Sequence, residues 1–227
     1  MLDLGRIRAL CFDVDGTLSD TDDLWVSNVQ RQLKKIFPRR DTLRMARWLV
    51  MGIESPGNYI YSLLDRIGLD DEVAWFYSKI SQINHKDKKP RFWLIPKTRE
   101  VLHALHQRYP LAVVSARGQD GTLAFLNQYE LRPFFHTIVT AQTCEYTKPF
   151  PHPVLRAAQE MGVRPEECVM IGDTTVDIRA GKLAGAQTVG VLCGFGDEAE
   201  LRRAGADLIL QSPYELLNVF NGQAEAG

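Results

Sequence analysis

The hydrophobic pattern of the chain separates short runs that are almost entirely apolar from longer segments in which apolar residues recur with a helical period. A nearly uninterrupted, β-prone run predicts a strand that is buried on both faces. Such runs occupy 7–14, 111–115, 137–140, 168–171 and 188–192, with a weaker run at 208–210. They predict the strands of one buried sheet.

Helical segments lie between the later runs. The apolar positions that define them are Val101, Leu102 and Leu105, then Leu123 and Leu126, then Val154, Ala158 and Met161, and finally Ile178, Leu183 and Ala184. Strands and helices that alternate along a chain indicate a parallel sheet covered by helices. The predicted fold class is therefore α/β, with a Rossmann-like parallel sheet flanked by helices.

A long interval after the first run interrupts this alternation, because its apolar residues keep a helical spacing only. Proline and glycine residues divide the interval into separate helices. We therefore expect an α-helical cap domain inserted into the α/β core. The expected boundaries are 20–91 for the cap domain, and 1–19 with 92–227 for the core domain.

Composition and charge exclude several classes of protein. Lys and Arg number 27 and Asp and Glu number 28, so no charge excess points to nucleic acid or to a membrane surface. No run approaches the length of a membrane span, and the N-terminal residues lack an apolar signal core. Four widely spaced cysteines without a C-x-x-C pair argue against a zinc site or a disulfide framework. We expect a cytoplasmic protein, a monomer or homodimer, whose partner is a small molecule.

The sequence D-V-D-G-T-L, from Asp13 to Leu18, follows the first predicted strand. Ligands of open parallel sheets bind at the carboxyl ends of the strands. Asp13 and Asp15 can both face such a site, so that one carboxylate attacks phosphorus while the other moves protons. Gly16 lets the backbone turn closely around a phosphate. Asp-rich turns also occur as plain loops or helix caps.

Three later segments carry chemistry of the same kind. Ser115 ends the second run, where its hydroxyl can bind a phosphate oxygen. Lys148 lies in K-P-F-P-H-P, whose prolines fix an extended approach, so its ammonium can neutralise a phosphoryl group. Asp173 and Asp177 lie in G-D-T-T-V-D after the fourth run, and their carboxylates suit Mg²⁺. Alone, each also fits a structural role as a cap or a surface residue.

Together these four motifs resemble those of the haloacid dehalogenase-like superfamily over essentially the whole chain. D-G-T-L-S-D-T, the segment I-G-D-T-T-V-D-I-R-A-G-K-L-A-G-A and the loop from Gly194 to Gly196 look most like the phosphoglycolate phosphatase branch. The resemblance implies a Mg²⁺-dependent phosphatase that hydrolyses small phosphorylated metabolites, such as phosphoglycolate-like phosphomonoesters, through an aspartyl-phosphate on Asp13. It also implies a central first strand and a small helical cap.

The resemblance assigns roles to individual residues. Asp13 would be the nucleophile and Asp15 the general acid and base, assisted by Ser115 and Lys148. The metal ligands would be the carboxylates of Asp13 and Asp173 and the backbone carbonyl of Asp15, with Asp177 in or behind that shell. The phosphate-binding residues would be Gly16, Thr17, Ser115, Ala116, Arg117 and Lys148. Family members often carry Asn after the serine, where this chain has Ala116, and Arg117 would reach the substrate or face solvent.

Other activities of the superfamily fit less well. The dehalogenase and phosphonatase branches lack the second acid that this chain has at Asp15. A sugar-phosphate mutase shares all four motifs, although that branch usually carries a histidine where this chain has Trp25. An inorganic pyrophosphatase stays open as well. A binding protein that kept only the fold is the least favoured alternative, because no acid or lysine of the motifs is missing.

The substrate cannot be ranked from the motifs, because the cap would select it. The candidate contacts there are Arg44, Arg47, Glu54, Asn58 and Tyr59. Basic residues of the same segment would steer an anionic substrate, or would simply form a solvated helix face.

Overall fold

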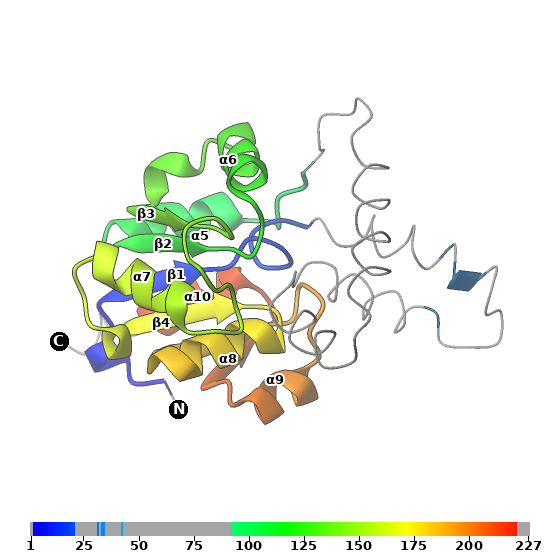
Figure 1. Ribbon diagram of the computed structural model, residues 1–227. Coiled ribbons are helices and arrows are strands. Elements are labelled where there is room, and N and C mark those ends of the chain that lie inside the picture. The colour runs from blue at the N-terminus through cyan, green and yellow to red at the C-terminus, as the bar shows by residue number, and fades with distance from the viewer. Residues whose placement is uncertain (1, 21–30, 32, 35–41, 43–91, 222–227) are drawn as a thin grey trace.

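The computed structural model describes residues 2–20, 31, 33, 34, 42 and 92–221 (Figure 1). The predicted cap domain and the candidate substrate contacts in it lie outside these residues, apart from a few isolated positions. The cap therefore stays a prediction. Among the described residues, no helix is both long enough and apolar enough to cross a membrane.

Six parallel strands form one sheet in the order β3-β2-β1-β4-β5-β6 (Figure 1). The strands are β1 (Ala9–Phe12), β2 (Leu111–Val114), β3 (Thr137–Val139), β4 (Cys168–Gly172), β5 (Gln187–Val191) and β6 (Leu208–Leu210). Each of the six predicted runs forms a strand, and the ends differ by at most two residues. The α/β fold class and the central position of the first strand are confirmed.

Helices connect the strands. The α-helices of the described part are α5 (Thr98–His106), α6 (Gln119–Gln128), α7 (His152–Glu160), α8 (Thr175–Ala184), α9 (Glu198–Ala204) and α10 (Leu216–Asn221). The short 3-10 helices are η1 (Leu4–Arg6), η2 (Arg132–Phe134), η3 (Pro165–Glu167) and η4 (Pro213–Glu215). The four predicted helical segments correspond to α5 through α8. Leu183 is 66% exposed, so it does not belong to the buried face of α8.

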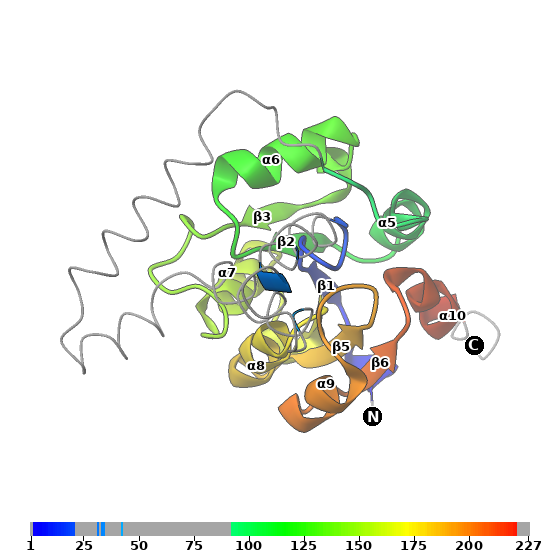
Figure 2. The same cartoon turned by 90° about the vertical axis from the view of Figure 1, so that its right-hand side faces the viewer.

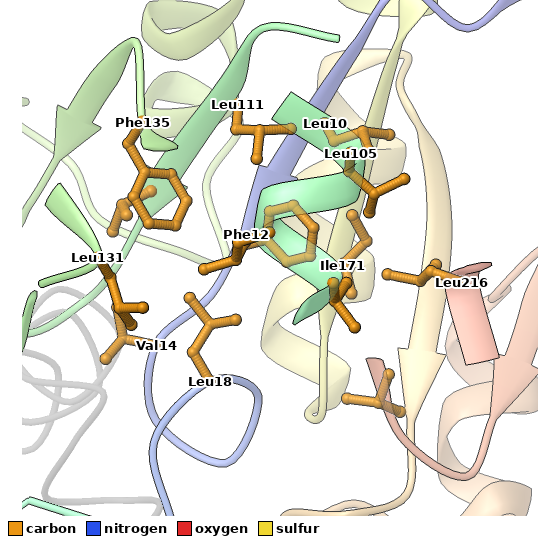
Figure 3. Close-up of a cluster of buried hydrophobic side chains, with 14 of the residues drawn as sticks. Leu10, Phe12, Val14, Leu18, Leu105, Leu111, Leu131, Phe135, Ile171 and Leu216 are labelled. Carbon is orange, nitrogen blue, oxygen red and sulfur yellow. The ribbon is translucent and has the colours of Figure 1, made fainter. Parts of the chain in front are cut away.

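The sheet is buried on both faces. Leu10 and Phe12 of β1 point into a cluster that also contains Leu105 of α5 and Leu216 of α10 (Figure 3). Figure 2 shows α5 and α10 on this side of the sheet and α7 and α8 on the other. Alternate residues of the same strands face α7 and α8, and this second cluster is rich in alanine and cysteine. Because both faces carry apolar side chains, the strands read as continuous apolar runs in the sequence.

The segments 18–20 and 93–95 pair with each other. Ser19 forms an antiparallel bridge with Leu94, and Asp20 donates its backbone N–H to the carbonyl of Trp93 at 2.8 Å. The backbone N–H of Ile95 donates to the carbonyl of Leu18 at 3.0 Å. This pairing places the connections at both ends of the 21–91 interval beside the carboxyl end of β1.

Candidate active site

The chemistry-bearing residues gather at the carboxyl edge of the sheet. Asp13, Ser115 and Asp173 directly follow β1, β2 and β4, and Lys148 lies in the connection after β3. Asp13 donates its backbone N–H to Ile171 of β4 at 2.9 Å, and Ser115 donates to Val139 of β3 at 2.9 Å. These bonds continue the ladder of the sheet by one residue. The two side chains are therefore positioned directly by strands of the sheet.

Lys148 binds two carboxylates at the centre of this edge. Its ammonium donates to Asp13 Oδ1 and to Asp177 Oδ1, both at 2.6 Å. All three side chains are buried. A buried ammonium needs such partners, because an isolated charge in the interior would be far less stable than in water. The structure thus brings together three residues that the sequence placed in separate motifs.

Asp177 also caps the first turn of helix α8. Its Oδ2 accepts the backbone N–H of Thr174 at 3.0 Å and the Thr174 hydroxyl at 2.6 Å, which forms a capping box. Gly172 makes this possible, since a Cβ there would lie 2.3 Å from the Asp177 side chain. Asp177 therefore joins the start of the helix to Lys148, a link that the sequence alone did not indicate.

The loop after β5 supports Asp173. The backbone N–H of Phe195 donates to Asp173 Oδ2 at 2.7 Å, and Cys193 Sγ lies 3.3 Å from the Gly16 carbonyl oxygen. A Cβ on Gly194 would lie 2.2 Å from Asp173 Oδ2 and 2.6 Å from the Gly16 carbonyl oxygen. In the sequence, this loop contributed only to the family resemblance, and no role in the site was assigned to it. The loop orients the carboxylate through a backbone donor.

Gly194→Ala is expected to disturb the acidic cluster, because the added methyl group needs the space that Asp173 occupies. We expect a loss of stability of about 1–3 kcal/mol and a weaker stabilisation by Mg²⁺. Thermal unfolding with MgCl₂ and with EDTA measures both effects. Gly5→Ala is the matched control, since its nearest neighbouring atom would be 3.5 Å away. Equal behaviour of the two variants would show that the close approach is unimportant.

Three buried acids form a candidate metal site. Asp13, Asp173 and Asp177 each place a carboxylate oxygen within 4.8 Å of the others. Asp173 Oδ1 is buried and has no hydrogen-bond partner among the described residues. A buried oxygen of this kind is costly unless it accepts a hydrogen bond or binds a cation, and carboxylate oxygens are ligands that Mg²⁺ prefers. The donor set fits the predicted Mg²⁺.

Burial controls the protonation of this cluster. It raises the pKa of Asp13 from its ordinary value of 3.8 to about 7, although the Lys148 ammonium opposes the rise. Burial also raises the pKa of Asp173 well above its usual range, and the charges of Asp177 and Asp13 add to the rise. Burial lowers the pKa of Lys148, but the charges of Asp13 and Asp177 outweigh this effect and raise it overall. The acids outnumber the lysine, so a bound divalent cation would balance them.

Stabilisation by Mg²⁺ is expected to increase as the pH rises from about 5 to about 8. The folded state holds the Asp13 proton more tightly than the unfolded chain, so the metal-free fold loses stability as the pH rises from 3.8 towards about 7. A cation that replaces this proton removes the loss. Thermal unfolding at a series of pH values, with MgCl₂ or with EDTA, measures the difference.

Asp173→Asn provides the control for this pH dependence. The amide keeps an acceptor for Phe195 but removes one buried charge, so the variant should be more stable than the wild type in EDTA. It should also lose most of its response to Mg²⁺. A response that is independent of pH, or that persists in this variant, would show that these acids do not hold the cation.

The turn after β1 is tightly bonded. Gly16 has a φ of 76°, a conformation that glycine adopts at little cost. The carbonyl of Val14 accepts the backbone N–H groups of Thr17, Leu18 and Ser19 at 3.3, 2.9 and 2.8 Å. The Thr17 hydroxyl is buried and has no hydrogen-bond partner in the part of the chain that the structure describes. This turn carries the second acid, Asp15, away from the buried cluster.

The carboxylate of Asp15 binds Arg117 instead of joining the other acids. Arg117 Nε donates to Asp15 Oδ2 at 3.0 Å, and Nη2 donates to Oδ1. The Arg117 side chain is 20% exposed, so it does not simply face solvent. Ser115 is 4% exposed, and its hydroxyl accepts the Arg117 backbone N–H at 3.1 Å. Ala116 lies between these residues and is half-buried.

Comparisons with known proteins cover nearly the whole chain. The family described as "Haloacid dehalogenase-like hydrolase" matches residues 10–191. Pyrophosphatase PpaX from Bacillus pumilus is 29% identical over 214 residues, which cover 94% of this chain and 96% of that protein. The solved structure of a hydrolase from Pseudomonas syringae is 28% identical, with a TM-score of 0.71 over 95% of this chain and 98% of that one. A predicted phosphoglycolate phosphatase from Haemophilus somnus, 21% identical, shares the fold with a TM-score of 0.67 over 94% and 98% of the two chains.

Proposed function

Because the chain belongs to the haloacid dehalogenase-like hydrolase family, we propose that it is a phosphatase that transfers a phosphoryl group to Asp13 and then to water. Its substrates would be small phosphorylated metabolites. The observation that carries this proposal is the buried Asp13–Lys148 pair at the carboxyl edge of the sheet, with Asp173 beside it and Asp15 two residues further along. The 29% identity to pyrophosphatase PpaX adds pyrophosphate to the candidate substrates.

Each residue has a distinct part in this proposal. Lys148 holds Asp13 Oδ1 and fixes the rotation of the carboxylate, so that Asp13 can approach phosphorus in one direction. As the phosphoryl group moves, the Lys148 ammonium stabilises its charge. The Ser115 hydroxyl donates to a phosphoryl oxygen. Asp15 gives a proton to the leaving oxygen and then takes one from the water that attacks the aspartyl-phosphate.

Asp13, Asp173 and the backbone carbonyl of Asp15 would hold Mg²⁺, with Asp177 beside them. When bound, the ion would neutralise charge on the carboxylates and on the phosphoryl group. Asp177 keeps Lys148 in place, and the Phe195 N–H keeps Asp173 oriented. The helical cap predicted for 20–91 would supply further contacts to the substrate.

Phosphate release from a panel of compounds tests this function. The panel would contain phosphoglycolate, pyrophosphate, sugar phosphates and nucleotides, each with MgCl₂ and with EDTA. The proposal expects release that needs Mg²⁺. Movement of phosphate between two positions of a sugar without release would identify a mutase. Neither release nor transfer, with folded protein that binds Mg²⁺, would favour a binding protein.

A further inference from the structure

We propose that Arg117 selects substrates whose leaving group carries an anionic group of its own, a phosphoryl or a carboxylate group beside the bond that breaks. The inference rests on the proposed function and assigns it a substrate class. It begins from the bidentate ion pair between Arg117 and Asp15, in which Nε and Nη2 bind the two carboxylate oxygens. These two nitrogen atoms form the guanidinium fork. A guanidinium fork binds a carboxylate or a phosphoryl group with the same geometry.

Arg117 is held in place by more than this pair. Its guanidinium lies over the ring of Phe92, 4.9 Å from the centroid. Phe92 is fixed in turn, because its carbonyl accepts the Tyr129 hydroxyl at 2.6 Å and the Gln128 amide at 3.1 Å. A Cβ on Gly121 would lie 3.0 Å from Arg117 Cδ, so the glycine leaves room for the stem. The cation is therefore oriented before any ligand binds.

The position of Asp15 places this cation on the leaving side of the substrate. Asp15 can transfer a proton to the leaving oxygen only from about 3 Å away. A guanidinium bonded to the same carboxylate then lies within about 6 Å of the leaving oxygen. The second phosphoryl group of a phosphoanhydride, or a carboxylate one carbon from the ester oxygen, falls within that distance. Such a group can replace Asp15 as the acceptor of the fork.

This exchange links recognition to proton transfer. While the fork holds, both oxygens of Asp15 accept hydrogen bonds from a cation, and neither is arranged to give a proton away. An anionic leaving group binds the fork in place of Asp15, and Asp15 is then able to act as the general acid. A leaving group without such an anion leaves Asp15 bound to Arg117. Arg117 therefore discriminates by the charge of the leaving group.

Steady-state kinetics of Arg117→Met and Arg117→Lys test the inference, with pyrophosphate, phosphoglycolate and p-nitrophenyl phosphate as substrates. We expect Arg117→Met to lower kcat/KM for the first two at least about 30-fold more than for p-nitrophenyl phosphate, mainly through KM. Arg117→Lys should recover part of the difference. The better of the two anionic substrates shows whether the fork prefers phosphoryl or carboxylate. Arg99→Met, on an exposed arginine of α5, should not change the ratios.

An equal loss for all three substrates would overturn the inference and leave Arg117 as a residue that only positions Asp15. Wild-type turnover of a sugar phosphate or a nucleotide, but of neither pyrophosphate nor phosphoglycolate, would overturn the inference too. Turnover of no compound of the whole panel would instead overturn the proposed function. Calorimetry of pyrophosphate and orthophosphate binding to Asp13→Asn, with and without Arg117→Met, reports on recognition without catalysis. The second change should weaken pyrophosphate binding far more than orthophosphate binding, and an equal effect would contradict the inference.

Discussion

Asp13→Asn is expected to lower phosphate release by at least about 10⁴-fold, because the amide cannot attack phosphorus. The protein should stay folded, since the substitution removes one of three buried carboxylates that repel one another. Phosphate release under saturating substrate and Mg²⁺ measures the first effect, and thermal unfolding in EDTA measures the second.

The control for Asp13→Asn is Asp120→Asn, which makes the same chemical change on the exposed first turn of α6. It should keep wild-type activity. If Asp13→Asn retained more than about a tenth of the wild-type rate, the phosphoryl group would have to move directly to water, and Asp13 would be at most a ligand.

Lys148→Met is expected to have the second largest effect, on both activity and stability. It removes the cation between Asp13 and Asp177 and leaves buried carboxylates without their partner. Loss of one partner of a buried pair costs about 3–5 kcal/mol. Activity should fall at least about 10³-fold, because the charge of the phosphoryl group is no longer stabilised. Chemical denaturation at pH 8 and phosphate release measure the two effects.

Lys182→Met is the control for Lys148→Met, because it makes the same chemical change at a lysine outside the site. Lys182 Nζ binds Asp207 at 2.5 Å, but its side chain is 36% exposed, so its removal should cost less than about 1 kcal/mol and leave activity intact. For Lys148→Met, the loss of stability should shrink below pH 7, where Asp13 takes up a proton. If Lys148→Met lost no more stability than Lys182→Met, the result would contradict the assignment of Lys148 and its two carboxylate partners as buried.

The fold could be predicted because each strand of the sheet is buried on both faces. Leu10, Cys11 and Phe12 of β1 are fully buried, so the strand appears in the sequence as an apolar run with no polar interruption. Helices α9 and α10 were not predicted, since they are short and polar or lie close to the end of the chain. Leu183 shows the limit of periodicity, because an apolar residue in a helix need not face the core.

The acids and the lysine of the site could be predicted from their places after strands, but their pairing could not. Arg117 and Asp15 are 102 residues apart in the sequence, and the packing of Phe92 and α6 helps to direct the guanidinium to that carboxylate. The bond from Phe195 to Asp173 uses a backbone N–H, which any residue type would supply. Such contacts depend on how the loops pack, and residue type alone does not reveal them.

Chemical trapping of the phosphoryl group tests the central claim most directly. Asp15→Asn, mixed with ³²P-labelled p-nitrophenyl phosphate and Mg²⁺ and quenched in acid, should carry label, because this leaving group needs no proton while hydrolysis of the intermediate needs the base. Peptide mapping should place the label on Asp13, and the label should be lost at alkaline pH. Label on another residue, or the absence of label while phosphate is still released, would contradict an aspartyl-phosphate on Asp13.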